Sequence, residues 1–188
     1  MKFLELKGAI RGNIFTFIEA LKHFPKETPQ TIKTQVSRFV KKNLLTRIKR
    51  GLYCFDPKQI DELELAHRLY QPSYISLETA LNFYGIIPDI PQTVTSVTLT
   101  TTKQIHNQFG TFSYNKIKPQ LYFGFTKVKS PTTSSFFDLA QKEKALLDYF
   151  YLRKIKTTKG LRLDLKNLDK SRYQQYVKNY PSWVGKLI

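Results

Sequence analysis

The carboxylates of one helical segment are the first residues to weigh for chemistry. Glu143 and Asp148 lie five residues apart in EKALLDYF. On a helix this spacing places two side chains about 140° apart around the axis, so the pair cannot converge as a general acid and base. The spacing instead favours a structural role, such as a salt bridge or a helix cap.

The other chemically versatile residues are isolated in the sequence. His23, His67 and His106 have no neighbours at the spacing of metal ligands. Cys54, the only cysteine, is interpreted as a small buried hydrophobe in a strand, because no pattern of His and Asn or Asp accompanies it. There is no glycine-rich phosphate loop. The sequence therefore predicts no catalytic residue, no metal and no cofactor, and hence that the protein is not an enzyme.

Positive charge is the strongest chemical signal in the sequence. The formal net charge is +17, which attracts polyanions such as nucleic acid, an anionic membrane or an acidic protein. Residues 1–55 hold 12 basic and 3 acidic residues, residues 56–150 hold 9 of each, and residues 151–188 hold 10 and 2. Two basic ends flank a neutral middle. This uneven distribution favours specific use of the ends over a uniformly solvated lysine-rich surface.

The first basic block has the helix signals of a helix-turn-helix. Thr16 and Glu19 form a capping box at the start of one helix, and an earlier helix is expected over residues 2–10. Thr28 is a good N-cap for a second helix, with Pro29 at its first position and Asn43 at its left-handed end. The connection of about four residues predicts a helix-turn-helix whose second helix enters a major groove.

A basic hairpin follows the second helix directly. In NLLTRIKRGLYCF, residues 45–48 and 52–55 are expected to be strands, with Lys49, Arg50 and Gly51 as the turn. This hairpin is interpreted as a wing whose tip neutralises phosphates. Thr34, Ser37 and Arg38 are the candidates for base readout. The full set of predicted DNA-binding residues is Thr31, Lys33, Thr34, Ser37, Arg38, Lys41, Arg47, Lys49 and Arg50.

The middle of the chain predicts helices mixed with strands. Helices are expected over residues 59–70, from Ser76 as the cap to Gly85, and across QKEKALLDYFYLRK. Strands are expected in TVTSVTLTT and as a pair within residues 110–129, joined at 118–120. Together they predict a small antiparallel sheet packed by helices.

Aromatic side chains on these strands leave a second interpretation open. Tyr114, Tyr122 and Phe125 could stack on unpaired bases, as sheet aromatics do in RNA-binding modules. A core role is favoured, because this block carries no net positive charge. The last block predicts a short strand over 161–165 and a helix capped by Asp169. The positive charge of this block is equally compatible with a larger DNA-contacting surface, with binding of an acidic toxin and with binding of an RNA.

The predicted fold class is α+β, divided at the Asp56-Pro57 turn signal. Residues 1–56 are expected to form a winged helix-turn-helix DNA-binding domain, and residues 57–188 a small α+β domain with an antiparallel sheet. The N-terminus lacks the apolar run of a signal peptide, and the chain lacks a membrane-spanning stretch. A cytoplasmic protein without a membrane partner is therefore expected.

Three segments in order resemble a known family. QVSRFVKKNLLTRIKRGLYCF is similar to the winged helix at the start of AbiEi-type antitoxins of abortive-infection (type IV) toxin–antitoxin systems. YISLETALNFYGIIPDIPQTVTSVTLTT and EKALLDYFYL resemble the family's next helix-and-strand segment and its later helix. The resemblance covers roughly residues 12–155, and many members carry a longer C-terminal domain.

The resemblance implies a function in phage defence. It implies a transcriptional autorepressor that binds its own operator as double-stranded DNA and counteracts a nucleotidyltransferase-like toxin encoded beside it. Residues 57–188 would then be the antitoxin or effector domain. The sequence is compatible with one copy of the chain bound to the operator and equally with a homodimer bound to an inverted repeat. The alternative is an RNA- or protein-binding adaptor that uses the basic C-terminal end, without sequence-specific DNA binding.

Overall fold

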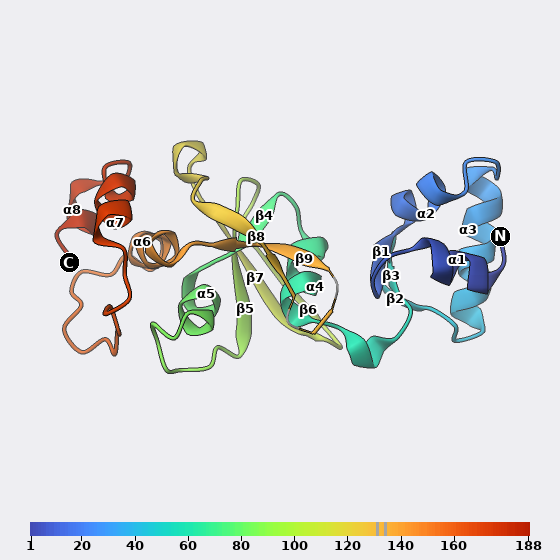
Figure 1. Ribbon diagram of the computed structural model, residues 1–188, viewed down its shortest axis with the longest axis horizontal. Helices are drawn as coiled ribbons and strands as arrows, with labels where there is room; N and C mark the ends of the chain where they lie inside the picture. Colours follow the sequence, from blue (N-terminus) through green and yellow to red (C-terminus); the bar gives the residue numbers. More distant parts are fainter. Residues whose placement is uncertain (131, 134) are drawn as a thin grey trace. The chain divides into compact units, whose positions relative to one another are not determined.

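The computed structural model describes residues 1–130, 132–133 and 135–188. They divide into two compact units, which are treated separately: an N-terminal unit of Met1–Leu65 with Lys129–Ser135, and a C-terminal unit of Ala66–Val128 with Phe136–Ile188. The described residues contain eight α-helices and two sheets (Figure 1), so the mixed α+β class is confirmed. This division groups residues 57–65 with the N-terminal unit, whereas the turn signal at Asp56-Pro57 predicts that they belong to the second domain.

The N-terminal unit combines three helices with a three-stranded antiparallel sheet of order β1-β3-β2. Its elements are α1 (Phe3–Ala9), β1 (Ile14–Thr16), α2 (Phe17–His23), α3 (Pro29–Lys41), β2 (Thr46–Lys49), β3 (Leu52–Cys54) and the 3-10 turn η1 (Pro57–Gln59). The expected hairpin is present as β2 and β3. The third strand, β1, was not predicted.

The helix ends of this unit follow the predicted local signals. Thr16 Oγ1 accepts a hydrogen bond from the Glu19 N–H at 3.1 Å, and the Glu19 carboxylate accepts one from the Thr16 N–H at 2.6 Å. Thr28 Oγ1 accepts from the Thr31 N–H at 3.1 Å, with Pro29 at the first helical position. Asn43 has a φ of 56°, the left-handed conformation predicted at the end of α3. These predictions are confirmed.

A single apolar core holds the three helices and the sheet together. It contains Leu6, Ile10, Phe15, Ala20, Ile32, Val36, Phe39 and Leu45. Ile32, Val36 and Phe39 form an apolar stripe along α3, and burying each such side chain is worth about 1.5–3 kcal/mol. Because this stripe faces the core, the opposite face of α3 is directed to solvent.

The C-terminal unit is built on a six-stranded sheet of order β6-β7-β5-β4-β9-β8. Its strands are β4 (Ser73–Ile75), β5 (Thr93–Thr98), β6 (Lys103–Asn107), β7 (Gly110–Lys116), β8 (Phe125–Lys129) and β9 (Phe136–Ala140). Its helical elements are α4 (Glu62–Leu69), which begins in the first unit, α5 (Leu77–Phe83), η2 (Pro119–Leu121), α6 (Lys142–Leu152), α7 (Lys170–Val177) and α8 (Ser182–Gly185). α6 packs against α5, α7 and α8 (Figure 1).

The prediction of an antiparallel sheet is wrong, because the sheet is mixed. β5 pairs in parallel with β7, with Val94 opposite Phe112, and β4 pairs in parallel with β9 at Ile75 and Leu139. The prediction assumed that strands adjacent in sequence pair with each other. Instead β6 and β7 form a hairpin that places β7, the later strand, beside β5.

Three more local predictions are wrong for the same reason, namely that partners lie far away in sequence. β7 and β8 are not joined as neighbours: β8 pairs beside β9, and residues 119–121 form η2. Residues 161–165 alternate in burial but form no strand, and the Asp164 N–H donates to the Ile86 carbonyl at 2.9 Å. Ser76 occupies the N-cap position of α5, yet its hydroxyl donates to Asp148 and accepts no hydrogen bond from the N–H groups of the helix.

The predicted cap of α7 is confirmed, because Asp169 accepts a hydrogen bond from the Arg172 N–H.

Candidate functional site

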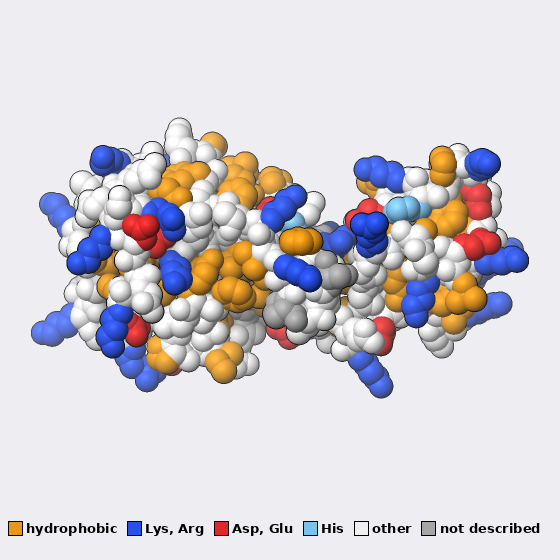
Figure 2. Space-filling model, in the orientation of Figure 1, with side chains coloured by type: hydrophobic (Ala, Val, Ile, Leu, Met, Phe, Trp, Pro, Cys, Tyr) orange, Lys and Arg blue, Asp and Glu red, His pale blue; other side chains and the backbone are white. Residues whose placement is uncertain are grey.

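The outward face of α3 is the first candidate site. A shallow groove on this face is lined by Gln30, Lys33, Thr34, Ser37, Arg38 and Lys41. Their spacing of three and four residues places them on one side of the helix. All nine predicted DNA-binding side chains are exposed, including Thr31 beside this groove and Arg47, Lys49 and Arg50 on the hairpin. Figure 2 shows Lys and Arg side chains projecting from the surface of this unit.

Two of the predicted DNA-binding residues, Thr31 and Thr34, already use their hydroxyl groups in hydrogen bonds within the protein. The Thr31 hydroxyl lies 2.8 Å from the Thr28 hydroxyl, as part of the N-terminal cap. The Thr34 hydroxyl donates to the Gln30 carbonyl at 3.0 Å. A hydroxyl has one proton to donate, so Thr34 retains only acceptor capacity toward a ligand. Ser37 and Arg38 are therefore the stronger candidates for base contacts.

The basic hairpin turn is attached to the start of α2. The Gly51 carbonyl accepts a hydrogen bond from the Phe17 N–H at 2.8 Å. Gly51 has a φ of 81°, which a residue with a Cβ adopts only under strain. On β2 the alternation of exposure directs Arg47 and Lys49 to solvent, and Arg50 is exposed in the turn itself. The turn thus carries its positive charge at a fixed position relative to α2.

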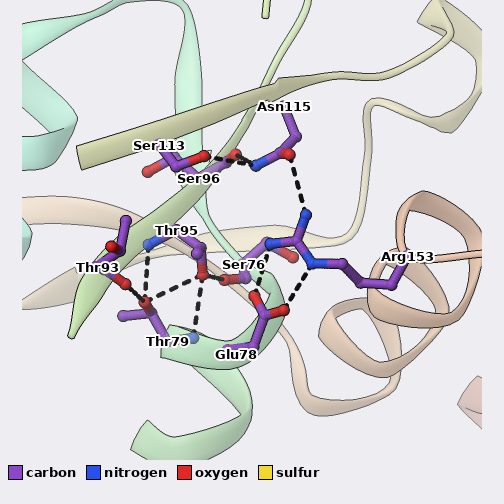
Figure 3. A network of polar contacts seen from close by, with 9 residues as sticks. All are labelled: Ser76, Glu78, Thr79, Thr93, Thr95, Ser96, Ser113, Asn115 and Arg153. Atoms are coloured by element: carbon purple, nitrogen blue, oxygen red, sulfur yellow. Dashed lines mark hydrogen bonds and ion pairs between the residues drawn. The ribbon is translucent and has the colours of Figure 1, made fainter. Parts of the chain in front are cut away.

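The C-terminal unit contains a polar network that links α5, α6 and two strands (Figure 3). Arg153 donates through Nε and Nη2 to the two carboxylate oxygens of Glu78, at 2.6 and 2.9 Å, and through Nη1 to Asn115 at 3.2 Å. The hydrogen bond to Glu78 is the main cause that raises the pKa of Arg153 above its ordinary value. Such a two-point ion pair fixes geometry, because the guanidinium plane matches the carboxylate.

The hydroxyl groups of Thr79 and Thr95 form the second half of this network. The Thr95 N–H donates to the Thr79 hydroxyl at 2.8 Å, and the Thr95 hydroxyl donates to the Ser76 carbonyl at 2.8 Å. These bonds attach the first turn of α5 to β5. The groups in Figure 3 mainly bond one another, so the network supports a structural role.

A buried charge cluster lies between α6 and the segments that cover it. Lys144 and Asp148 form an ion pair with both side chains fully buried. Asp148 also accepts hydrogen bonds from Tyr74 and Ser76, both at 2.9 Å, and from Tyr180 at 2.7 Å. Burial lowers the pKa of Lys144, against the opposing effect of Asp148, and raises the pKa of Tyr74 and Tyr180 well above the ordinary value. These groups face one another and have no access to solvent.

The two carboxylates of α6 bind different partners. Asp148 belongs to the buried cluster, whereas Glu143 accepts a hydrogen bond from the Asp169 N–H at 2.9 Å and lies 3.6 Å from Arg172. The expectation that they do not form a catalytic pair agrees with these contacts. Sequence reasoning missed the partners Tyr74, Ser76 and Tyr180, because contacts over 32 to 74 residues leave no local signal.

The remaining candidates for chemistry are separate from one another. His67 Nδ1 lies 3.2 Å from the Ser73 carbonyl and His106 Nδ1 lies 3.0 Å from the Thr111 hydroxyl. Burial raises the pKa of Cys54 to about 11, so its thiol is a poor nucleophile. The part of the chain that the structure describes contains no group of three or more His, Cys, Asp or Glu side chains arranged for a metal ion. Nor do the described residues include a helix long and apolar enough to cross a bilayer.

Comparison with known proteins adds no family. No protein-family model matches the chain, and no curated protein matches it. Function is therefore inferred from the surface of α3, the adjoining hairpin and the sequence resemblance.

Proposed function

We propose that this chain is a DNA-binding antitoxin and autorepressor whose residues 1–56 act as a winged helix. The observation that carries the proposal is the combination of the α3 groove with the basic β2–β3 turn in one unit. α2 and α3 pack together, and the turn is bonded to the first residue of α2. Residues 1–55, with a net charge of +9, supply a field that attracts a polyanion.

In this proposal α3 lies in the major groove. Its 13 residues span about 20 Å, sufficient to cross a groove about 12 Å wide. Ser37 and Arg38 contact base edges, and Arg38 forms two hydrogen bonds with a guanine, which discriminates against other bases by about 1–3 kcal/mol. Lys33 and Lys41 lie on the same face and contact flanking phosphates.

The hairpin acts as the wing and contacts the DNA backbone. Arg47, Lys49 and Arg50 neutralise phosphates and release counterions, so binding weakens as salt rises. These contacts position the protein and carry no sequence information. Sequence preference therefore comes from α3, and a large share of the affinity comes from the turn.

The antitoxin part of the proposal is supported by the order of the three segments that resemble AbiEi-type antitoxins. The first segment runs from within α3 to the residue after β3, the second contains most of β4 with α5 and β5, and the third falls within α6. α5 and α6 pack against each other. The proposed partners are the chain's own operator DNA and a nucleotidyltransferase-like toxin encoded by a neighbouring gene.

DNA binding is tested by fluorescence anisotropy on a labelled duplex from the region upstream of the gene. A scrambled duplex serves as competitor at several salt concentrations. We expect a preference for the native duplex that persists as salt rises. Arg38→Ala should abolish that preference, whereas Arg11→Ala, which removes the same charge from an exposed site outside α3 and the hairpin, should retain it. Equal binding to both duplexes would contradict autorepression.

Toxin antagonism is tested separately, by co-expression with the product of the neighbouring gene. We expect the chain to restore growth when both genes are driven by foreign promoters. Arg38→Ala should restore growth equally, because transcriptional repression is bypassed in this arrangement. If the wild-type chain fails to restore growth, the antitoxin function is contradicted, whereas the proposed DNA binding is not affected.

A further inference from the structure

The C-terminal unit contains an apolar cavity of about 800 Å³ that belongs to neither the α3 groove nor the buried charge cluster. It is formed by the end of β7 and the residues after it, by the end of α6 and by Trp183 of α8. Its size falls within the range of small-molecule sites, about 300–1,000 Å³. None of the proposals for the N-terminal unit uses it.

One wall of the cavity offers an aromatic surface. The rings of Tyr151 and Trp183 are stacked, with centroids 6.2 Å apart and planes inclined by 23°. Tyr180 packs edge-on against Tyr151 at 5.8 Å and supports it from behind the wall. Trp183 remains 39% exposed, and Tyr151 is half-buried. A flat ring bound here would stack on this surface and remove it from water.

The rim of the cavity is basic. Four lysines line it: Lys116 at the end of β7, Lys118 just after it, and Lys154 and Lys156 from the segment after α6. All four are exposed, and none of the ten lining residues is acidic. Like charges gathered around one cavity repel one another, and an anion with several charges relieves this repulsion.

The backbone at Lys154 adds to this arrangement. Lys154 has a φ of 53°, a left-handed conformation that glycine or asparagine adopts at lower cost. Its N–H donates to the Tyr151 carbonyl at 3.3 Å, which closes the end of α6. A lysine at this position contributes charge to the rim at the expense of backbone strain.

We propose that this cavity binds a nucleoside triphosphate. The base stacks on Trp183, and the phosphates contact the four lysines. An aromatic wall beside several separated positive charges fits a ligand that is both flat and multiply charged. A fatty acid carries a single carboxylate and would leave most of the rim unpaired. The proposal assigns part of the basic C-terminal segment to this site and does not depend on DNA binding by α3.

The test uses the intrinsic fluorescence of Trp183, the only tryptophan in the chain. Excitation at the red edge of tryptophan absorption avoids the tyrosines, and the full-length protein is titrated with ATP, adenosine and inorganic tripolyphosphate. We expect saturable quenching by ATP, with an affinity at least about fivefold higher than for tripolyphosphate, since one stacked base contributes at least that factor. ATP should also bind more tightly than adenosine, which lacks the charges that contact the lysines. Equal affinity for tripolyphosphate, or no saturable change with ATP, would overturn the proposal.

Matched variants locate the binding. Lys156→Glu should weaken ATP binding at least about fivefold. Lys159→Glu makes the same charge change at an exposed lysine of the same segment that does not line the cavity, and it should leave affinity within about twofold. Lys154→Gly removes one rim charge while relieving backbone strain, so weaker binding by this variant is not explained by unfolding. Equal loss in the Lys156 and Lys159 variants would show binding to general surface charge and would overturn the proposal.

Discussion

Individual arginines of the N-terminal unit are expected to make different contributions to DNA binding. Arg38 lies on α3 and is assigned to bases, whereas Arg50 lies in the β2–β3 turn and is assigned to a phosphate. We predict that Arg50→Ala weakens binding to native and scrambled duplexes alike. The slope of log K against log salt should become shallower by about 0.9, the value for one phosphate contact on duplex DNA. Anisotropy titrations at several salt concentrations measure both quantities.

The matching control for the Arg50 prediction is Arg11→Ala. It removes one exposed positive charge from the same unit, outside α3 and the hairpin. We expect it to leave the salt slope unchanged. If Arg50→Ala changes preference between duplexes but not the slope, the turn contacts bases, and its assignment to phosphates is wrong.

The buried pair of α6 gives a residue-level prediction about stability. Asp148 balances the charge of Lys144 and accepts hydrogen bonds from three hydroxyl groups. Removing one partner of a buried pair leaves an unpaired charge and typically costs about 3–5 kcal/mol. We therefore expect Asp148→Asn to lower the free energy of unfolding by about that amount, measured by urea denaturation followed by circular dichroism.

A double variant separates charge from packing in this cluster. Lys144→Met with Asp148→Asn removes both charges, keeps an acceptor for the hydroxyl groups and preserves side-chain volume closely. We expect it to be more stable than Asp148→Asn alone, because no unpaired charge stays buried. Equal destabilisation of the single and double variants would show that the cost lies in the hydrogen bonds.

Among the elements, α3 depends on its N-terminal cap. Thr28 Oγ1 accepts from the Thr31 N–H and lies 2.8 Å from the Thr31 hydroxyl. We predict that Thr28→Ala lowers the free energy of unfolding by about 1 kcal/mol, while Thr28→Ser, which keeps the acceptor, changes it by much less. Chemical denaturation of the three proteins measures the difference. A full loss in Thr28→Ser would assign the effect to the methyl group instead of the cap.

The accuracy of sequence prediction also differs between elements. Helix starts at Thr16, Thr28 and Asp169 were predicted correctly, because the capping residue lies within three residues of the N–H that it satisfies. The order of strands in the sheet was not predicted, because β4 and β5 pair with each other and each also has a distant second neighbour, β9 for β4 and β7 for β5. No local pattern records which of two distant strands becomes a neighbour.

The same limit explains which site residues were found. The α3 face was predicted because its members recur every three or four residues on one helix. The aromatic cavity brings together three segments near residues 116, 151 and 183, and the Glu78–Arg153 pair joins residues 75 positions apart. These groupings depend on tertiary packing of α6, which periodicity does not encode.

For the whole molecule, tyrosines whose pKa is raised by burial determine how stability changes at alkaline pH. Burial raises the pKa of Tyr74 and Tyr180 well above the ordinary value of 10.0, raises that of Tyr114, and raises that of Tyr122 to about 12. Above pH 10 the unfolded chain therefore loses protons that the folded chain keeps. Stability is fully present below that pH and falls as pH rises through the window between the two pKa values.

Lys144 changes the stability of the fold with pH in the opposite direction. Its pKa is lowered by burial, so between its folded pKa and the ordinary value of 10.5 the unfolded chain binds more protons and stability rises with pH. Lys144 opposes the tyrosines named above, and burial also raises the pKa of Tyr84, Tyr149 and Tyr173. Above pH 10.5 the contribution of Lys144 no longer changes. We therefore predict a net loss of unfolding free energy above about pH 10, measured by urea denaturation from neutral to alkaline pH, with tyrosinate absorbance recorded in parallel.

Tyr114→Phe tests whether the tyrosines cause this loss. The Tyr114 hydroxyl donates to the Ala66 carbonyl at 2.6 Å, so the variant should be less stable at neutral pH by about 1 kcal/mol. Above pH 10 its free energy of unfolding should fall less steeply than that of the wild type, because one group that ionises only on unfolding is gone. An unchanged slope would mean that alkaline unfolding arises elsewhere, for instance from self-repulsion of remaining charge, and the assignment to buried tyrosines would be wrong.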